Sequence, residues 1–147
     1  EVAETDQNSL AYFIQNGTQT TRRLGAGERA GVLYSFQAAF GALPSSVSDW
    51  QDVVKIANGR WPGQVDEDTE FNARAAFRRI YHQDAQPDNP HDQAALTIIS
   101  YGLRPVVRNL ESEERAIRSF RHIYGYDPES ATAWDIVRAI AYSGASK

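Results

Sequence analysis

The sequence predicts an all-α protein made of tandem helical hairpins of about 42 residues each. An aromatic pair with a spacing of four residues occurs three times, at intervals of 41 and 43 residues, as Phe36 and Phe40, Phe77 and Tyr81, and Phe120 and Tyr124. An isoleucine near the end of a second apolar segment recurs at intervals of 43 and 41 residues, as Ile56, Ile99 and Ile140. Self-similarity at a nearly fixed period is typical of helical arrays, α-solenoid-like or compact.

Seven helices are expected along the chain, at about 8–16, 28–40, 49–58, 68–81, 91–101, 111–124 and 133–142. They form one domain, 1–147, that begins with a half repeat, 8–24, and continues with three repeats, 25–66, 67–108 and 109–147. A half repeat at one end can cap an exposed apolar face, and it can equally belong to a longer array.

The first helix of each repeat carries an apolar stripe. Phe36 and Phe40 share a helical face with Val32 and Leu33, one turn earlier. Glycine ends two of these helices, at Gly41 and Gly125.

The second helices have recognisable starts. Ser48 and Thr132 have capping-box spacing to a polar residue three positions later, and Asn89 precedes a proline that suits the first helical position. Trp50 and Trp134 occupy equivalent positions and are expected in the core.

Two similar stretches, ANGRWP at 57–62 and SYGLRP at 100–105, follow second helices. Each has a glycine where a helix would end and a proline three residues later, so we interpret both as helix stops. A ligand loop is the alternative interpretation. Under it, Trp61 and Arg104, both expected to be exposed, would be the binding residues.

Composition excludes several classes of protein. The 147 residues are 41% hydrophobic and 23% charged, with a net charge of −4, so nucleic acid is not an expected partner. No apolar run approaches the roughly 18 residues of a membrane span. The chain has no Cys, which excludes disulfides, and no Met even at position 1, which leads us to expect export after removal of an N-terminal signal.

Catalytic and metal-binding patterns are not found in the sequence. His82, His91 and His122 are far apart, and the acidic stretch 66–70 lacks the spacing of a calcium loop. We therefore expect no catalytic residues, metal or cofactor, and a non-enzymatic protein. An enzyme whose site gathers residues from several helices stays open.

Arginines and aromatic residues are the candidates for binding. Arg78 and Arg121 belong to arginine-rich first helices, which would form a basic strip for a polyanion if equivalent helices stack in parallel. The alternative is a solvated face paired with glutamates such as Glu70, Glu111 and Glu114. Trp61, Tyr126 and Tyr142 could stack on sugar rings if exposed.

The repeat pattern resembles tandem helical units of uncharacterised exported or cell-surface proteins of candidate-phylum bacteria. The residues that carry the resemblance are Phe36, Phe40, Gly41, Pro44, Asp49, Trp50, Ile56 and Gly59, then Phe120, Tyr124, Gly125, Pro128, Trp134 and Ile140. The middle repeat departs from it, with His82 in place of glycine and Gln93 in place of tryptophan. The resemblance implies export and a repeat fold, and it implies no activity.

A looser similarity, over 116–134, is to a small helical peptidoglycan-binding module, whose glycine-rich DG-x-x-G loop is missing here. The sequence thus leads us to expect a non-enzymatic extracellular or cell-surface structural or adhesive protein, with self-assembly as one form of it. Its partners would be itself, another surface protein, a cell-wall glycan or an acidic surface polymer. The alternative is a cell-wall glycan-binding module.

Overall fold

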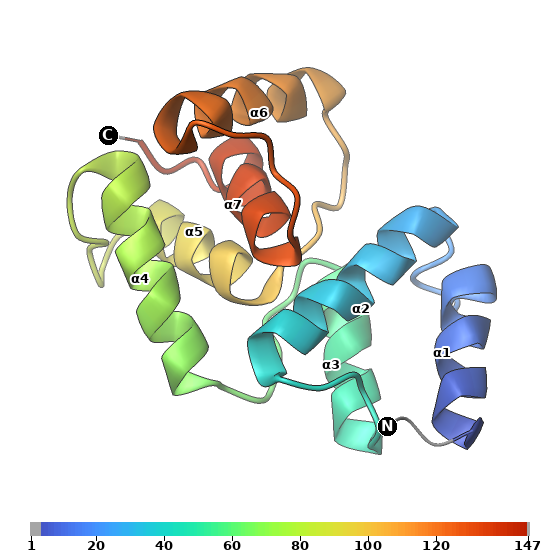
Figure 1. Cartoon of the computed structure of the whole chain (residues 1–147). Coiled ribbons are helices and arrows are strands. Elements are labelled where there is room, and N and C mark those ends of the chain that lie inside the picture. The colour runs from blue at the N-terminus through green and yellow to red at the C-terminus, as the bar shows by residue number, and fades with distance from the viewer. Residues whose placement is uncertain (1–3, 147) are drawn as a thin grey trace.

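A computed structural model describes residues 4–146, and this part of the chain contains seven α-helices and no strand. The all-α prediction is confirmed (Figure 1). The helices are α1 (Glu4–Asn16), α2 (Ala26–Phe40), α3 (Val47–Ala57), α4 (Glu67–Tyr81), α5 (Pro90–Tyr101), α6 (Leu110–Tyr124) and α7 (Ala131–Tyr142). None of them is long and apolar enough to cross a membrane.

Two of the predicted helix starts are wrong by about half a turn. The N-cap of α3 is Ser46, not Ser48, and its hydroxyl accepts a hydrogen bond from the Asp49 N–H at 3.1 Å. Ser130, not Thr132, caps α7 in the same way. Ser46 and Ser130 are the N-caps because each has extended backbone, from which its hydroxyl reaches the third N–H of the helix. The predicted cap at Asn89 is confirmed.

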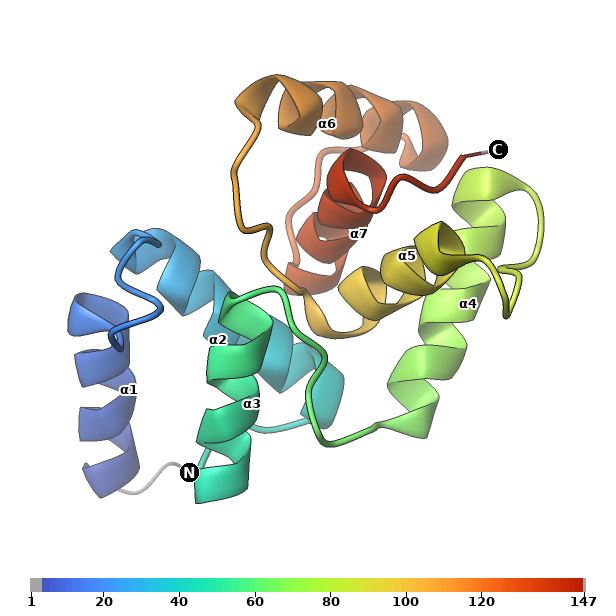
Figure 2. The ribbon, with the colours of Figure 1, turned by 180° about the vertical axis from the view of Figure 1, so that it is seen from behind.

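Helix α7 lies at the centre of the molecule, in contact with α5, α6 and α2 (Figures 1 and 2). Helix α5 also packs against α4 and α2, whereas α1 and α3 both pack on α2. The core contains the first aromatic residue of each predicted pair, Phe36, Phe77 and Phe120, all of them buried. Burying aromatic side chains of this size is the main source of stability for such helices.

The contact between α2 and α7 distinguishes this packing from an open solenoid. In a linear array each helical hairpin touches only its neighbours along the chain. Here a helix of the first predicted repeat packs directly on a helix of the third. The helices therefore form a compact arrangement, and the surfaces of α2 and α7 must fit each other.

The two helix stops are in direct contact with each other. Gly59 and Gly102 both have left-handed backbone, with φ of 75° and 76°. The Arg104 N–H donates a hydrogen bond to the Ile56 carbonyl at 3.0 Å, so the second stop crosses the end of α3. A Cβ atom on Gly59 would lie 2.7 Å from the Arg104 carbonyl oxygen. Gly59 is thus required both for its φ and for this close approach.

Substituting alanine at Gly59 tests this double requirement. Gly41 is the matched control, because it has a left-handed φ of 83° but nothing within 4 Å of the point that a Cβ atom would occupy. We expect Gly41→Ala to cost about 1–2 kcal/mol from backbone strain alone. Gly59→Ala should cost at least about 1 kcal/mol more, because the methyl group would displace backbone. Urea unfolding of both variants measures the difference, and equal costs would contradict the close approach.

Candidate functional site

A cavity of about 480 Å³ lies between the first half of α2 and α7, with the segment after α5 and the start of α6 as its other walls. Its size is typical of small-molecule sites. Its lining is unusually rich in charge for an acidic protein. The lining includes Arg23, Glu28, Gly31, Arg104, Arg108, Glu113, Trp134, Arg138 and Tyr142.

The sequence led us to expect an exposed Arg104, but the structure buries it, with only 2% of its surface accessible. The left-handed turn at Gly102 directs the chain inward, and the side chain extends between α2 and α7. Its guanidinium donates to the Gly102 carbonyl and, through Nε, to Glu28 at 3.1 Å. Nη1 lies 3.6 Å from the Asp135 carboxylate, whereas Nη2 is buried without a hydrogen-bond partner.

Asp135 and Arg138 project from α7 one turn apart and complete the cluster. The Asp135 carboxylate accepts hydrogen bonds from the Ser35 hydroxyl at 3.0 Å and from Arg138 Nη1 at 2.9 Å. Arg138 Nη2 lies 3.9 Å from the nearest Glu28 oxygen, beyond hydrogen-bond distance. We call Glu28, Arg104, Asp135 and Arg138 the α2–α7 charge cluster.

Burial shifts the protonation equilibria of this cluster. It raises the pKa of Asp135 to about 6, although the positive charges of Arg104 and Arg138 act in the opposite direction. It also lowers the pKa of Arg104 to about 10, with the neighbouring Arg138 adding to the effect and the two carboxylates opposing it. Arg104 is therefore charged at neutral pH, and Asp135 is the group that titrates near it.

Gly31 permits the close approach of Arg104 to α2. A Cβ atom at this position would lie 2.8 Å from Arg104 Nη2 and 4.0 Å from Arg138 Nη2. A glycine inside a helix is unfavourable unless something needs the space. Here the guanidinium of Arg104 needs it.

A tyrosine and an arginine hold the wall formed by α6. The Tyr142 hydroxyl accepts a hydrogen bond from the Asn109 N–H at 3.0 Å and donates to Glu113. Arg108 Nε donates to the same carboxylate at 3.0 Å. Burial raises the pKa of Glu113, but the hydrogen bonds from Arg108 and Tyr142 outweigh it and leave the pKa lowered. Tyr142, a predicted binding residue, thus lines the cavity with its hydroxyl already engaged.

Arg23 stands at another edge of the cavity and has no acidic partner among the described residues. Its guanidinium donates to the carbonyls of Ala57, at the end of α3, at 2.8 Å and of Pro105 at 3.2 Å. These bonds fix the segment after α5 against the end of α3.

Trp134 is a side wall of the cavity, and the prediction that it belongs to the core is wrong. It is 39% exposed, and Gly31 of α2, which lines the same hollow, has no side chain that could cover it. Trp50, which occupies the equivalent position in the first predicted repeat, is partly buried and packs on Phe13, with 5.5 Å between the ring centroids. Helix α1 thus covers Trp50, and nothing among the described residues covers Trp134 to the same extent.

Trp61 is exposed as predicted and lines a smaller hollow of about 280 Å³. Glu70, Arg74 and Tyr101 also line it. The Tyr101 hydroxyl accepts a hydrogen bond from the Asp66 N–H at 3.0 Å and donates to Glu70. Trp61 and Arg104, paired by the sequence, therefore lie in different hollows.

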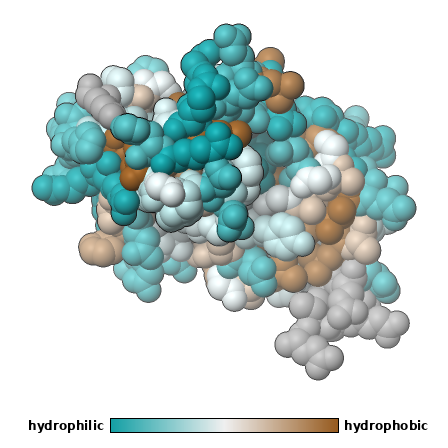
Figure 3. Space-filling view, turned by 45° about the horizontal axis from the view of Figure 1, so that its top comes forward, coloured by the Kyte–Doolittle hydropathy of each residue, from teal (hydrophilic) through white to brown (hydrophobic). Residues whose placement is uncertain are grey.

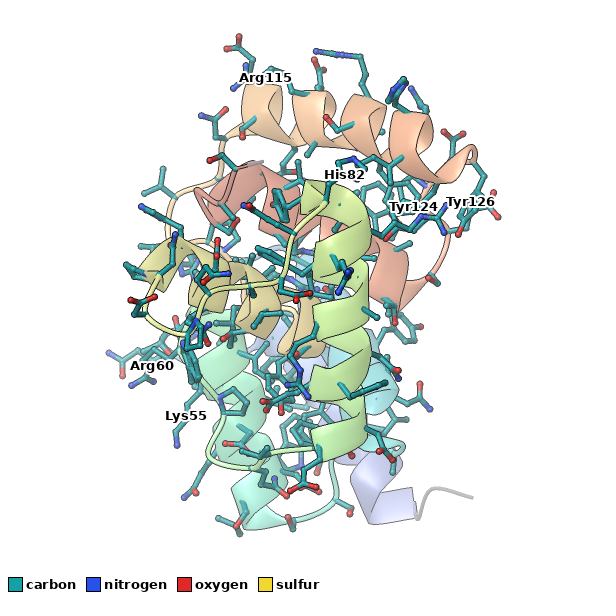
Figure 4. The ribbon with its side chains drawn as sticks, turned by 90° about the vertical axis from the view of Figure 1, so that its left-hand side faces the viewer. Lys55, Arg60, His82, Arg115, Tyr124 and Tyr126 are labelled. Carbon is teal, nitrogen blue, oxygen red and sulfur yellow. The ribbon has the colours of Figure 1, made fainter. Side chains whose placement is uncertain are left out.

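The predicted arginine strip does not form. Helix α4 and helix α6 cross each other instead of running parallel (Figure 4). Arg78 and Arg121 are both exposed, and they pair with Asp84 and Asp127 in the loops that follow their helices, not with the expected glutamates. Such exposed pairs contribute little to stability.

Tyr126 is exposed, as expected, but the structure does not bring it to the cavity. Its ring packs edge-on against Phe120, with 5.7 Å between centroids, and it lies with Tyr124 at the C-terminal end of α6 (Figure 4). Arg115 lies toward the other end of that helix.

Two of the three histidines, His82 and His91, lie at helix ends. His82 takes the left-handed position at the end of α4, with φ of 62°, and His91 Nδ1 lies 3.1 Å from the Ser143 carbonyl oxygen. Within residues 4–146 no group of three or more His, Cys, Asp or Glu side chains could hold a metal ion.

Alanine at Gly31 tests the close contact between α2 and Arg104. Gly27, in the same helix, has nothing within 4 Å of a Cβ position and is the control. Gly27→Ala should stabilise the protein by a few tenths to about 1 kcal/mol, as glycine replacement in a helix usually does. Gly31→Ala should instead lower the free energy of unfolding by about 1 kcal/mol or more, because the buried guanidinium must move. Equal gains in thermal or urea unfolding would refute the contact.

The raised pKa of Asp135 predicts a pH dependence of stability. The folded-state pKa of about 6 exceeds the ordinary value of 3.8, so the folded state binds the proton more tightly than the unfolded state. This stabilisation is fully present below the unfolded pKa and is lost as the pH rises through about 6. Relative to Asp135→Asn, the native protein should lose about 2–3 kcal/mol between about pH 4 and pH 7.

Urea unfolding of both proteins at several pH values measures this change. The Asp84→Asn variant, which removes an exposed carboxylate, is the control and should show a much smaller change. A native protein that gains stability over Asp135→Asn as the pH rises would contradict the raised pKa.

Comparisons with protein-family models, with curated proteins and with solved structures give no match for this chain. The resemblance to exported helical-repeat proteins therefore stays a prediction from the sequence.

Proposed function

We propose that the chain is an array of three and a half helical hairpins that serves as a non-enzymatic adhesive module outside the cell or on its surface. The helix bounds support the array. Helices α2, α4 and α6 each contain 15 residues. Their starts are separated by the same intervals of 41 and 43 residues as the aromatic pairs, at residues 26, 67 and 110.

Recurring hydrogen bonds also support the array. Tyr101 in the second repeat and Tyr142 in the third each join the end of one helix to the N-cap N–H and to a glutamate of the first turn of its hairpin partner. In the first repeat the glutamate position is taken by Arg29, whose guanidinium donates to carbonyls of the half repeat, including Ile14 at 2.9 Å. The half repeat is thereby attached to the first repeat.

The observation that carries the adhesive function is that the two hollows occupy corresponding positions in successive repeats. The smaller hollow belongs to the second repeat, and the cavity between α2 and α7 belongs to the third. When the repeats are aligned, the lining residues of the smaller hollow and of the cavity correspond as Trp61 and Arg104, Glu70 and Glu113, Gln93 and Trp134, Leu96 and Val137, Thr97 and Arg138, and Tyr101 and Tyr142. Each hollow has one tryptophan and one tyrosine–glutamate pair. A hollow that recurs along an array suits a polymer of repeating units, such as a surface or cell-wall glycan, better than it suits catalysis.

The outer surface of α6 favours adhesion over end-to-end assembly. Its exposed residues include Glu111, Glu114, Arg115 and Arg118. The face of the molecule that carries α6 is largely hydrophilic (Figure 3). End-to-end assembly of helical repeats buries an apolar face of each unit on the next one. Self-assembly is thus less well supported than binding to a polymer.

Co-sedimentation with insoluble cell-wall and capsule preparations tests the adhesive function. We expect the native protein to sediment with at least one polymer, and the double variant Trp61→Ala, Trp134→Ala to lose at least about tenfold in affinity, because both hollows lose their aromatic wall. The control is Tyr12→Ala with Phe71→Ala, which removes two exposed aromatic residues that line neither hollow.

Light scattering after size exclusion should give a monomer of 16.4 kDa in the same samples. Concentration-dependent oligomers would favour the self-assembling form of the proposal. Equal sedimentation of the two double variants, or none by the native protein, would contradict adhesion through the hollows.

A further inference from the structure

We propose that the cavity between α2 and α7 binds the carboxylate of an acidic sugar residue, with the sugar ring against Trp134. The inference rests on the proposed adhesive function and names the ligand class of its larger hollow. It is carried by the charge of the cavity, its free donors, and the spacing of Trp134 and Arg138 on α7.

The charge of the cavity favours a single negative charge. Arg23, Arg104, Arg108 and Arg138 line it, against Glu28 and Glu113 in the lining and Asp135 immediately behind it. Four arginines against three carboxylates leave one positive charge, in a protein whose net charge is −4. A carboxylate balances that charge, whereas a doubly charged phosphate would leave an excess beside Glu28.

Arg138 presents the donor that a carboxylate would use. Its Nη1 is held by Asp135 at 2.9 Å, and its Nη2 is too far from Glu28, at 3.9 Å, for a hydrogen bond. The Arg138 side chain is 15% exposed, so it is fixed in place and still reachable from the cavity. Arg104 stands behind it as a buried charge with an unpartnered Nη2. Fixed guanidinium groups of this kind suit planar carboxylates.

Trp134 and Arg138 have the spacing of a sugar ring and its carboxylate. They are four residues apart on α7, so their Cβ atoms are about 5–6 Å apart on one face of the helix. A pyranose whose apolar C–H face stacks on the indole would place a carboxylate at its edge near Arg138. The carboxylates of Glu28 and Glu113 line the same cavity and can accept hydrogen bonds from ring hydroxyls.

The smaller hollow of the second repeat is an internal comparison. There Thr97 stands where the third repeat has Arg138, and Trp61 where it has Arg104. It keeps the tyrosine–glutamate pair and an aromatic residue but lacks the arginine pair of the larger cavity. Preference for an acidic sugar should therefore belong to the cavity between α2 and α7 alone.

Nuclear magnetic resonance titration of the ¹⁵N-labelled protein with trigalacturonate tests the inference. Its methyl ester, a neutral sugar of the same shape, and inorganic phosphate are the comparison probes. We expect trigalacturonate to shift the Trp134 indole and the Arg138 side-chain signals, with the ester and phosphate binding at least about tenfold more weakly.

Variants locate the binding. Arg138→Gln should weaken trigalacturonate binding by roughly tenfold or more, and Trp134→Ala by a similar factor. Arg78→Gln removes an equal charge from an exposed ion pair and should change affinity by less than about twofold. If Arg138→Gln fails to fold because Asp135 loses a partner, Trp134→Ala against Trp61→Ala makes the same comparison at half-exposed positions.

The inference is overturned if the ester or phosphate binds as tightly as trigalacturonate, if no binding occurs, or if variants inside and outside the cavity weaken binding equally. Cell-wall sedimentation separates this failure from that of the adhesive function. A protein that sediments with neutral polymers but ignores trigalacturonate refutes only the acidic-sugar site. A protein that binds trigalacturonate at Arg138 but sediments with no polymer refutes only adhesion.

Discussion

The buried guanidinium of Arg104 is the interaction on which the packing of this molecule depends. It lies between α2 and α7 and joins Glu28 and Asp135, which belong to helices far apart in the sequence. Removing such charges from water costs several kcal/mol, and their mutual attraction repays this only with close geometry and further hydrogen bonds. The Ser35 hydroxyl and the Gly102 carbonyl provide the further hydrogen bonds, and Gly31 permits the close geometry because it has no side chain. They thereby fix how α2 lies on α7, and with it the shape of the cavity.

Local features were predictable from the sequence because short-range chemistry sets them. The helices, the aromatic stripes and the left-handed glycines at 59 and 102 all follow from spacing and backbone preference. The burial of Arg104 and the exposure of Trp134 were not predictable, because each depends on where α2 lies relative to distant parts of the chain. Gly31 was the one local sign, since a glycine inside a helix often marks close approach.

The smaller hollow and the cavity between α2 and α7 differ in several lining residues, whereas the tyrosine–glutamate hydrogen bonds at their edges are the same. The tyrosine–glutamate bonds that hold each wall involve backbone caps and first-turn residues, at the edge of the hollow. The residues that change, Thr97 against Arg138 and Trp61 against Arg104, line the hollows and take no part in those bonds. A framework held at its edges lets the chemistry inside vary, and this separation of fold from site is common among proteins.

The cost of the α2–α7 charge cluster bears on its role. Well-packed apolar side chains of similar volume often replace a buried ion network without loss of stability. Apolar side chains could also close α2 onto α7, whereas in this chain the charge cluster does so. Burial raises the pKa of Asp135 and lowers that of Arg104, so both ionised groups are held in surroundings that oppose their charges. Groups held in this way are typical of binding and catalytic sites. In this chain the cluster has two roles, because it fixes how α2 lies on α7 and it holds a positive charge beside Trp134 in the cavity.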